Sequence, residues 1–312
     1  MKKIKVIFMG TPDFSVAPLE KINELYDVIL VVTQPDKEVG RKKEIKFSPV
    51  KEFAIENNIE IFQPVKIRED YKRIIDLNPD IIITCAYGQI IPKEILECPK
   101  YGCVNIHASL LPKLRGGAPI HKAIINGYDK TGVTIMYMDE KMDSGDIIYQ
   151  EEIPILDTDN AGTLFDKLSV LGSNMIIKVL PDIIEGSNNR IKQNEDEVTY
   201  AYNITREEEK IDFNKSTREV FNQIRGLYPW PVGYSTLDDK KIKIFSSQIG
   251  NSNKEAKNGE IINIYNDSIG IKTSDGEILI KEIQLEGKKR VSVKDYLNGI
   301  QDKNSLIGKI FK

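Results

Sequence analysis

The chain has 312 residues, of which 40% are hydrophobic and 29% are charged, with three cysteines and a formal net charge of -3. This composition is typical of a folded globular protein and excludes a disordered chain or a disulfide-stapled secreted domain. The small negative charge gives no general reason to expect nucleic acid, although basic residues are in slight excess beyond residue 200.

The chain opens with a short basic segment and an apolar run, KVIFMG. This run is too short for the core of a secretion signal, and no later stretch reaches the length of a membrane span. Together with the small number of cysteines, these features predict a cytoplasmic protein with no membrane partner. The apolar run is predicted to be the first β-strand.

Short apolar runs alternate with amphipathic stretches through the first half of the chain. After KVIFMG come DVILVVT, IEIF, DIIITCAY and GCVNIHA. Continuous apolar strands separated by helical patterns predict a parallel sheet covered on both faces. Ser48 before Pro49 and Ala118 before Pro119 predict two helix starts.

Residues 131–155, TGVTIMYMDEKMDSGDIIYQEEIPI, predict two antiparallel strands joined by a turn at DSG. A helix is predicted over residues 160–184, and the polar, non-periodic residues that follow it indicate a linker. Beyond residue 229, alternating segments with turn residues at short spacing are typical of a small antiparallel barrel or sandwich.

One polar pair lies at the end of a predicted strand. Successive side chains of a strand face opposite sides, so Val104 and Ile106 share one face while Asn105 and His107 share the other. Ligands of open α/β sheets bind at the carboxyl ends of the strands. The pair is therefore either a catalytic constellation or a hydrogen-bonded structural pair, and the spacing alone does not decide.

The segment after this strand, SLLPKLRGGAPI, is predicted to be an irregular loop because of Pro112, Gly116 and Gly117. Paired glycines allow the backbone to approach a ligand closely, and they also occur in ordinary turns.

Three carboxylates follow in the turn MDEKMDSGDII: Asp139, Asp143 and Asp146. A carboxylate beside a histidine favours the imidazolium and orients the ring, which suits a general acid or base. Spacing does not distinguish the three from one another or from residues of a solvated turn.

Common cofactor motifs are missing from the sequence. The glycine-rich turn after the first strand lacks G-x-G-x-x-G, and no P-loop or H-E-x-x-H occurs. The cysteines lack zinc spacing, so no metal is predicted.

A series of segments, in order and over nearly the full chain, resembles the methionyl-tRNA formyltransferase family. The segments are GTPDF, TQPDK, SPVKEFA, FQPV, AYGQIIP, GCVNIHASLLPKLRGGAPI, TGVTIMYMDEKMDSGDI and YPWPVG. The N-x-H…S-L-L-P…D-x-G set is shared by the wider family of 10-formyltetrahydrofolate-dependent transferases. The basic stretch TQPDKEVGRKKEIKFSPVK and the YPWPVG region are shared more narrowly and point to the tRNA enzymes.

The resemblance implies an α/β fold with a Rossmann-like formyltransferase domain over residues 1–188, a linker over 189–206 and a C-terminal, tRNA-binding OB-like β-barrel over 207–312. The implied reaction transfers the formyl group of 10-formyltetrahydrofolate to the amino group of methionine on initiator methionyl-tRNA. The product, N-formylmethionyl-tRNA, serves translation initiation. The implied enzyme is a monomer that uses no metal.

The family motifs also assign residues by position. The catalytic set carried over is Asn105, His107 and Asp143, which selects one of the three aspartates. The positions that match the folate-binding segments are Ala86, Tyr87, Gly88, Ile90, Ser109, Leu110, Leu111 and Pro112. The positions that match the tRNA-binding loop are Arg41, Lys42, Lys43 and Lys46.

The basic segment is predicted to be an irregular loop that contacts the tRNA acceptor stem, the alternative being a solvated run of charges. One departure from the family lies in TYAYNI, where Asn203 replaces the usual lysine. Two rival functions share some of these features. One is a formyltransferase acting on an amino-sugar nucleotide or another small amine, and the other is an inactive folate- or RNA-binding protein.

Overall fold

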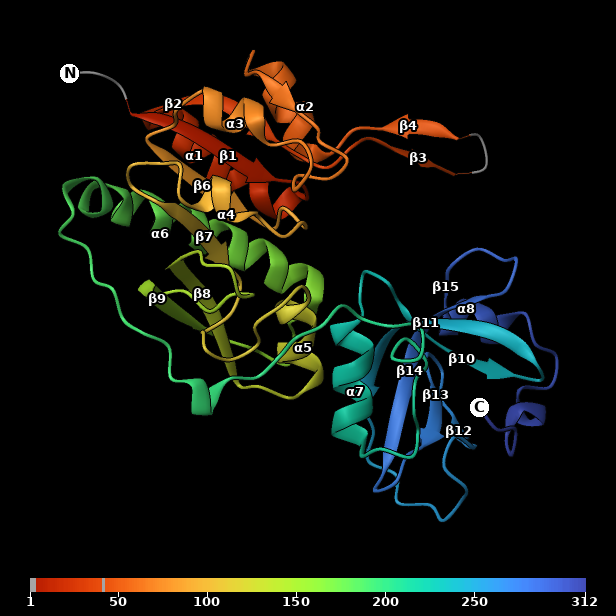
Figure 1. The fold of residues 1–312 in the computed structure, drawn as a ribbon. Helices are drawn as coiled ribbons and strands as arrows, with labels where there is room; N and C mark the ends of the chain where they lie inside the picture. Colours follow the sequence, from red (N-terminus) through yellow and green to blue (C-terminus); the bar gives the residue numbers. More distant parts are fainter. Residues whose placement is uncertain (1–3, 41–42) are drawn as a thin grey trace. The chain divides into compact units, whose positions relative to one another are not determined.

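The computed structural model describes residues 4–40 and 43–312 (Figure 1). Its contacts divide the chain into two compact units, each assembled from three stretches of sequence. The first unit holds the chain up to Pro119 with Lys130–Pro154 and Phe165–Tyr202, and the second holds Ile120–Asp129, Ile155–Leu164 and Asn203–Lys312. The second unit therefore takes in two short stretches that precede residue 188.

The first unit is built on a seven-stranded sheet with the order β5-β2-β1-β6-β7-β8-β9. The first five of these strands are parallel, whereas β8 and β9 are antiparallel, and both findings confirm the predictions. The strands are β1 (Lys5–Gly10), β2 (Asp27–Val32), β5 (Ile61–Phe62), β6 (Ile81–Cys85), β7 (Cys103–His107), β8 (Lys130–Tyr137) and β9 (Ile147–Pro154).

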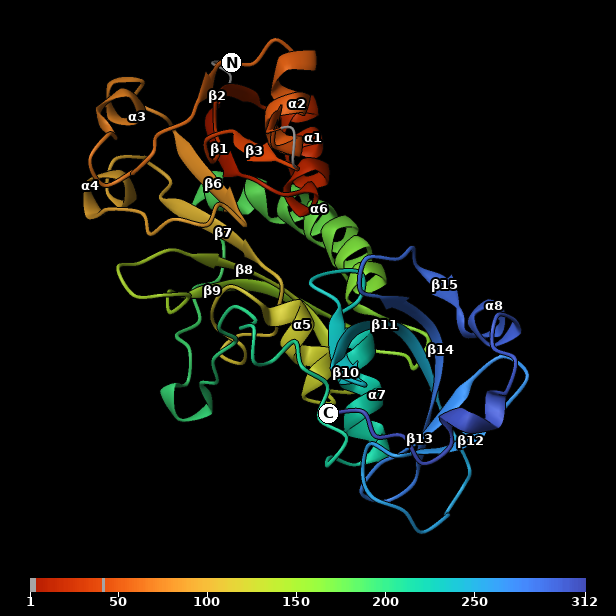
Figure 2. The same ribbon diagram turned by 90° about the vertical axis from the view of Figure 1, so that its right-hand side faces the viewer.

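Helices cover both faces of this sheet. Figure 2 shows α3 and α4 on one side and α1, α2 and α6 on the other. Because both faces are covered, the central strand β6 is buried at every residue and reads as a continuous apolar run. The helices are α1 (Val16–Leu25), α2 (Pro49–Glu56), α3 (Lys72–Asp76), α4 (Lys93–Leu96) and α6 (Ala161–Glu185).

Alternation along β7 sends its side chains to the two faces. Ile106 lies against α6. Cys103 faces the other way, and its thiol donates to the carbonyl oxygen of Ile95 in α4. Asn105 and His107 share the face of Cys103, so they lie on the side of the sheet away from α6.

Both predicted helix starts are observed. Pro49 is the first residue of α2, and the Ser48 hydroxyl caps the helix by accepting a hydrogen bond of 3.1 Å from the Lys51 amide. The second helix, α5 (Pro119–Ile125), begins at its predicted proline.

The prediction of an irregular loop around the basic residues is wrong for the part that the structure describes. β3 (Lys37–Val39) and β4 (Glu44–Lys46) pair as an antiparallel hairpin. Both strands are three residues long, and β4 is fully exposed, so no buried face imposes the alternation that identifies a strand in a sequence. Two of the expected tRNA contacts, Arg41 and Lys42, lie outside the described residues.

The second unit contains an antiparallel sheet with the order β10-β11-β14-β13-β12 and with β15 beside β14. Helix α7 begins with a capping box between Ser216 and Glu219. The strands are β10 (Gly233–Leu237), β11 (Lys240–Ile249), β12 (Ile261–Ile264), β13 (Ile269–Lys272), β14 (Glu277–Leu285) and β15 (Val291–Ser292). The helices beside them, apart from α5, are α7 (Thr217–Gly226) and α8 (Val293–Asn298).

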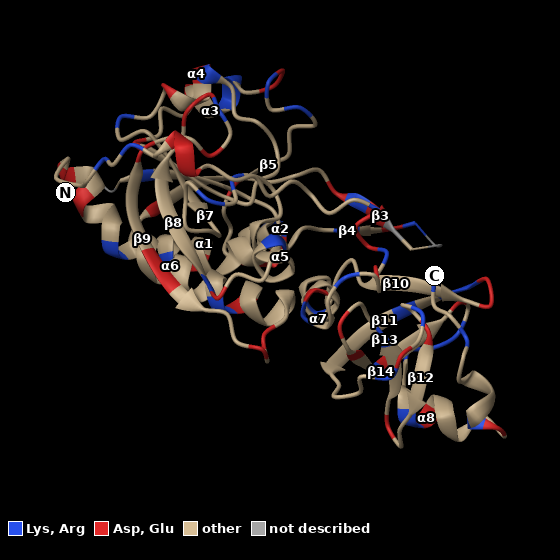
Figure 3. Ribbon diagram, turned by 90° about the horizontal axis from the view of Figure 1, so that it is seen from below, with Lys and Arg blue, Asp and Glu red and all other residues tan. Residues whose placement is uncertain are grey.

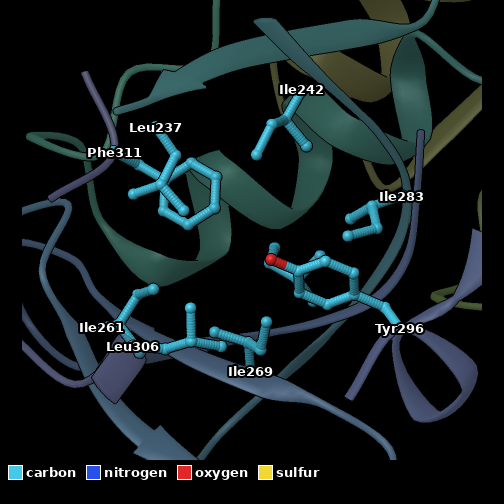
Figure 4. A pocket seen from close by; sticks show the side chains of 9 residues that line it. Leu237, Ile242, Ile261, Ile269, Ile283, Tyr296, Leu306 and Phe311 are labelled. Carbon is cyan, nitrogen blue, oxygen red and sulfur yellow. The ribbon is translucent and has the colours of Figure 1, made fainter. Parts of the chain in front are cut away.

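A small apolar cavity lies inside the second unit (Figure 4). Its lining is Leu237, Ile242, Ile261, Ile269, Ile280, Ile283, Tyr296, Leu306 and Phe311. The assigned strands run as an open path from β10 to β12, so their ladder alone does not close the barrel that the resemblance implies. Among the described helices, none is long and apolar enough to cross a membrane.

Candidate active site

The carboxyl end of β7 brings Asn105 next to β6. Asn105 pairs in register with Thr84, whose hydroxyl donates to the Asn105 side-chain oxygen Oδ1 across 2.8 Å. Because Oδ1 is held on that side, the amide nitrogen Nδ2 points the other way, toward the carboxylate of Asp143. The distance from Asn105 Nδ2 to Asp143 Oδ1 is 3.4 Å, a long hydrogen bond.

His107 ends the same strand with its ring almost completely buried. Its Nε2 lies 3.1 Å from the carbonyl oxygen of Leu114. A carbonyl oxygen can only accept, so Nε2 carries a hydrogen and donates it. The other ring nitrogen, Nδ1, faces Asp143 Oδ2 across 3.7 Å, which is too long for a hydrogen bond.

Asp143 lies between these two groups and the loop after β7. Its backbone has a positive φ of 50°, an uncommon conformation outside glycine. Its Oδ2 accepts a hydrogen bond of 2.8 Å from the amide of Gly116. Two loops and the end of β7 thus converge on one carboxylate.

The other two aspartates of this turn face elsewhere. Asp139 accepts from the amide of Lys141 and from the hydroxyl of Ser144 within its own turn. Asp146 pairs with Arg190, whose Nε lies 3.1 Å from its Oδ2. Of the three, Asp143 is the one that approaches the polar residues of β7.

The loop from Ser109 to Pro112 is held by hydrogen bonds to β8 and β9. The Thr134 hydroxyl donates to the Ser109 carbonyl across 2.6 Å and accepts from the Leu111 amide across 3.1 Å. The buried Ser109 hydroxyl itself donates to the Lys113 carbonyl. Leu111 packs in a small apolar cluster and precedes a cis peptide bond to Pro112.

The second expected folate-binding segment follows β6. Ala86 and Gly88 both have positive φ values, 48° and 88°, so the chain turns sharply there. Tyr87 points into the core, where burial raises the pKa of its hydroxyl, and within the described residues that hydroxyl has no hydrogen-bond partner. Ile90 is 64% exposed and offers an apolar side chain at the surface.

A segment expected to be a linker takes part in this site. We call residues 191–202 the strap. The Gln193 side-chain amide donates to the carbonyls of Asp143 and Gly145 across 2.8 and 2.9 Å. Its oxygen accepts two hydrogen bonds, of 3.0 and 2.8 Å, from the guanidinium of Arg115.

Arg115 is 3% exposed, and its charge is balanced by Glu195 of the strap across 2.8 Å. The hydrogen bond from this guanidinium lowers the pKa of Glu195. A buried guanidinium without such partners would be strongly destabilising. The strap therefore fixes both the loop of Asp143 and the loop that carries Arg115.

Backbone hydrogen bonds continue the same attachment. Ala201 donates to the Arg115 carbonyl across 2.7 Å and accepts from the Ala118 amide across 2.9 Å. The Thr199 hydroxyl accepts from the Leu114 amide. At Gly116, φ is 121° and a Cβ atom would lie 2.8 Å from the Ala201 carbonyl oxygen, so only glycine fits without displacement.

Sequence reasoning missed the strap because an extended segment that pairs with a loop has neither apolar periodicity nor a helix cap. The usable signal is weaker. The small residue Ala201 stands between two tyrosines, and in the structure it is buried while both tyrosines are exposed.

The basic hairpin carries charges of both signs, as Figure 3 shows. Lys43 lies 3.4 Å from Glu38, whereas Lys46 is exposed at the end of β4. At the base of the hairpin, Lys51 and Asp36 form an ion pair of 2.6 Å. Across the described part of the chain, no group of three or more His, Cys, Asp or Glu side chains is arranged to hold a metal ion.

Comparisons with known families cover both units. Residues 2–180 match the family described as formyl transferase, and residues 203–301 match the family described as formyl transferase, C-terminal domain. The methionyl-tRNA formyltransferase of Staphylococcus aureus (strain MW2) is 49% identical over 308 residues, which cover 98% of each chain. That of Bacillus thuringiensis subsp. konkukian (strain 97-27) is 52% identical over 300 residues, 95% of this chain and 96% of that one.

Solved structures share the fold. The sugar 3N-formyl transferase WlaRD, determined with dTDP and 5-N-formyl-THF, is 25% identical with a TM-score of 0.66, over 93% of this chain and 100% of that one. An N-formyltransferase from Helicobacter canadensis, in complex with folinic acid and dTDP-3-aminofucose, is 24% identical with a TM-score of 0.68, over 89% of this chain and 98% of that one.

Proposed function

We propose that Asn105, His107 and Asp143 form the catalytic set of this protein. The proposal starts from its membership of the formyl transferase family and, within it, of the methionyl-tRNA formyltransferases. The enzyme transfers a formyl group to the amino group of methionine on initiator methionyl-tRNA. The observation that carries the proposal is the convergence of Asn105 Nδ2 and His107 Nδ1 on the Asp143 carboxylate.

Formyl transfer needs hydrogen-bond donors for an oxygen that becomes negative. The methionine nitrogen forms a bond to the formyl carbon, the bond from that carbon to the folate nitrogen breaks, and a proton moves from the first nitrogen to the second. While both bonds exist, the formyl oxygen carries negative charge. Nδ2 of Asn105 supplies one donor for it, and Nδ1 of a protonated His107 supplies another.

Asp143 has two tasks in this proposal. Its carboxylate faces Nδ1 of His107 and orients the ring. The same carboxylate can accept the proton that leaves the attacking nitrogen and return it to the departing one. The long contacts to Asn105 and His107 fit a site whose hydrogen bonds tighten only when the substrates are bound.

The formyl donor in our proposal is 10-formyltetrahydrofolate, held between two segments of the first unit. These are Ala86, Tyr87, Gly88 and Ile90 after β6, and Ser109, Leu110, Leu111 and Pro112 after β7. Exposed Ile90 supports an apolar contact with the donor. The Ser109 hydroxyl is already used by Lys113, so its contribution would be as an acceptor.

The second unit is proposed to bind tRNA through an OB-like barrel, together with the basic residues Arg41, Lys42, Lys43 and Lys46. Support for a closed barrel comes from residues 309–312, which bond to both free sheet edges. Lys312 exchanges two backbone hydrogen bonds, of 3.0 and 2.9 Å, with Thr236 of β10. On the other side Ile261 of β12 donates to the Lys309 carbonyl across 2.8 Å.

We propose residues 1–188 for catalysis and folate binding, residues 189–206 as the connecting segment and residues 207–312 as the tRNA-binding barrel. We also propose that the protein is a monomer and that it is located in the cytoplasm.

The deciding experiment measures formyl transfer from 10-formyltetrahydrofolate to methionyl initiator tRNA, with wild-type protein and with His107→Ala. Free methionine and an amino-sugar nucleotide serve as competing acceptors, because the WlaRD relative acts on a sugar. Transfer to the charged tRNA that depends on His107 is expected. Transfer to the sugar alone would overturn the substrate, and undiminished transfer by His107→Ala would overturn the catalytic set.

A further inference from the structure

Two tyrosines of the strap form a stacked pair at the surface. The rings of Tyr200 and Tyr202 are nearly parallel, with centroids 5.5 Å apart and planes 4° apart. Tyr200 is 49% exposed and Tyr202 is 63% exposed. Aromatic rings contribute most when they bury their large surface, so a stacked and open pair is an unusual surface feature.

The pair results from the way the strap is attached. In an extended segment, alternate side chains face opposite sides. Ala201 is completely buried against the loop after β7, so the residues on either side of it, Tyr200 and Tyr202, both face outward. Their rings are two residues apart on the same side, where they can stack.

This surface is fastened to the catalytic loop. The strap residue between the two tyrosines, Ala201, bonds through its backbone to Arg115 and Ala118. Gly116, which lies between those two loop residues and touches the Ala201 carbonyl, donates its amide to the Asp143 carboxylate. The stacked pair is therefore fixed, through Ala201, to the loop that donates to the proposed catalytic carboxylate.

We propose that Tyr200 and Tyr202 are a stacking platform for an unpaired nucleotide near the 3′ end of methionyl-tRNA, an inference that rests on the proposed function. The methionine is esterified to a single-stranded end, whose bases can separate from one another and stack on aromatic side chains. Stacking the base beside the site would hold the ester, and so the amine, within reach of Asn105 and His107.

Charge distinguishes this surface from the basic hairpin. The charged strap residues nearest in sequence to the tyrosines are Glu195, Asp196 and Glu197. The strap therefore offers little attraction for phosphate groups. Binding here depends on the faces of the rings, and its contribution is insensitive to salt, unlike phosphate contacts.

The test compares Tyr200→Ala and Tyr202→Ala with the matched variants Tyr200→Phe and Tyr202→Phe. Each alanine variant is expected to raise KM for methionyl-tRNA by roughly fivefold to a hundredfold, the range measured for loss of base stacking. The ratio to wild type stays constant between low and physiological ionic strength. KM for the folate donor and the melting temperature stay unchanged, and the phenylalanine variants behave as wild type because they keep the ring faces.

A second readout is independent of turnover. In uncharged tRNA with 2-aminopurine replacing a base of the unpaired 3′ end, stacking quenches the fluorescence of the probe. Wild type and the phenylalanine variants should quench it, and the alanine variants should not.

The proposal is overturned if the alanine variants leave KM for tRNA unchanged, or raise both KM values equally. It is also overturned if the effect on KM disappears at higher salt. Failure of the proposed function looks different, because wild-type protein would then transfer no formyl group to methionyl-tRNA at all.

Discussion

The side-chain amide of Gln193 donates to the backbone carbonyl of Asp143 across 2.8 Å, and so ties the strap to the turn that carries the proposed catalytic carboxylate. Replacement by leucine removes this bond, the bond to Gly145 and both bonds from Arg115. We expect Gln193→Leu to lower kcat by roughly tenfold to a hundredfold, since small displacements of a reacting group have effects of that size. Steady-state kinetics with both substrates measure this effect, and the change in either KM should be much smaller than the change in kcat.

The matched control for Gln193 is Glu195→Gln. This variant alters the second partner of Arg115 without touching Asp143. It should keep kcat near the wild-type value. An equal loss of kcat in both variants would mean that Gln193 acts through Arg115 and not through the aspartate turn.

Asn105→Ala removes one proposed donor to the developing oxyanion. Loss of such a donor typically lowers kcat by about 10²–10³. Because the side chain lies at the end of a strand whose neighbours supply the core, the far-ultraviolet circular dichroism and the melting temperature should stay close to wild type. A loss in kcat of less than tenfold would contradict the proposed role of Asn105.

Gly116→Ala should destabilise the protein by about 1–3 kcal/mol, because alanine is strained at this φ and its Cβ would press on the Ala201 carbonyl. Urea unfolding measures the effect. Gly186→Ala is the control, since φ there is also positive but no atom lies within 4 Å of the added Cβ. Equal destabilisation by the two substitutions would mean that the contact with the strap adds nothing.

The basic residues between Arg41 and Lys46 are expected to make a salt-dependent contribution to tRNA binding. Arg41→Ala and Lys46→Ala should raise KM for methionyl-tRNA, leave KM for the folate donor unchanged, and lose most of their effect at high salt because screening weakens phosphate contacts. Lys66→Ala, at an exposed lysine outside the hairpin, serves as the control. Equal changes in both KM values would argue against a tRNA contact.

Burial raises the pKa of the Cys85 thiol from 9.0 to about 12. Between these pH values the folded state keeps a proton that the unfolded chain releases, so the free energy of unfolding falls as pH rises, by about 1.4 kcal/mol per pH unit. Below pH 9.0 this contribution is fully present. Urea unfolding of wild type and Cys85→Ala on both sides of that pH tests this, and parallel pH profiles for the two proteins would refute it.

Periodicity predicted the buried strands of the first unit, but helix α7, which buries Val220 and Ile224, was missed. The alternation of Val104, Asn105, Ile106 and His107 predicted which two side chains share a face, and in the structure Asn105 and His107 both face Asp143 while Ile106 packs against α6. A proline after a capping serine predicted the start of α2 for an equally local reason.

Elements with no buried face could not be predicted in this way. The exposed hairpin around Lys46 has no apolar side, and the strap pairs with a loop through scattered polar groups such as Gln193. The choice among the three aspartates depends on the turn at Asp143 and its positive φ of 50°, which is a property of backbone dihedrals and not of spacing. Only the family resemblance supplied that residue, and its catalytic role stays a prediction.

The strap also limits where the chain can be divided. A fragment ending at residue 188 would keep Asn105, His107 and Asp143 but would leave the guanidinium of Arg115 buried without Gln193 or Glu195. In an engineered chimera, the part taken from this protein would therefore have to extend through Tyr202, the last residue of the first unit. During synthesis, likewise, the site is complete only once the ribosome has released the strap, well after every proposed catalytic side chain has emerged.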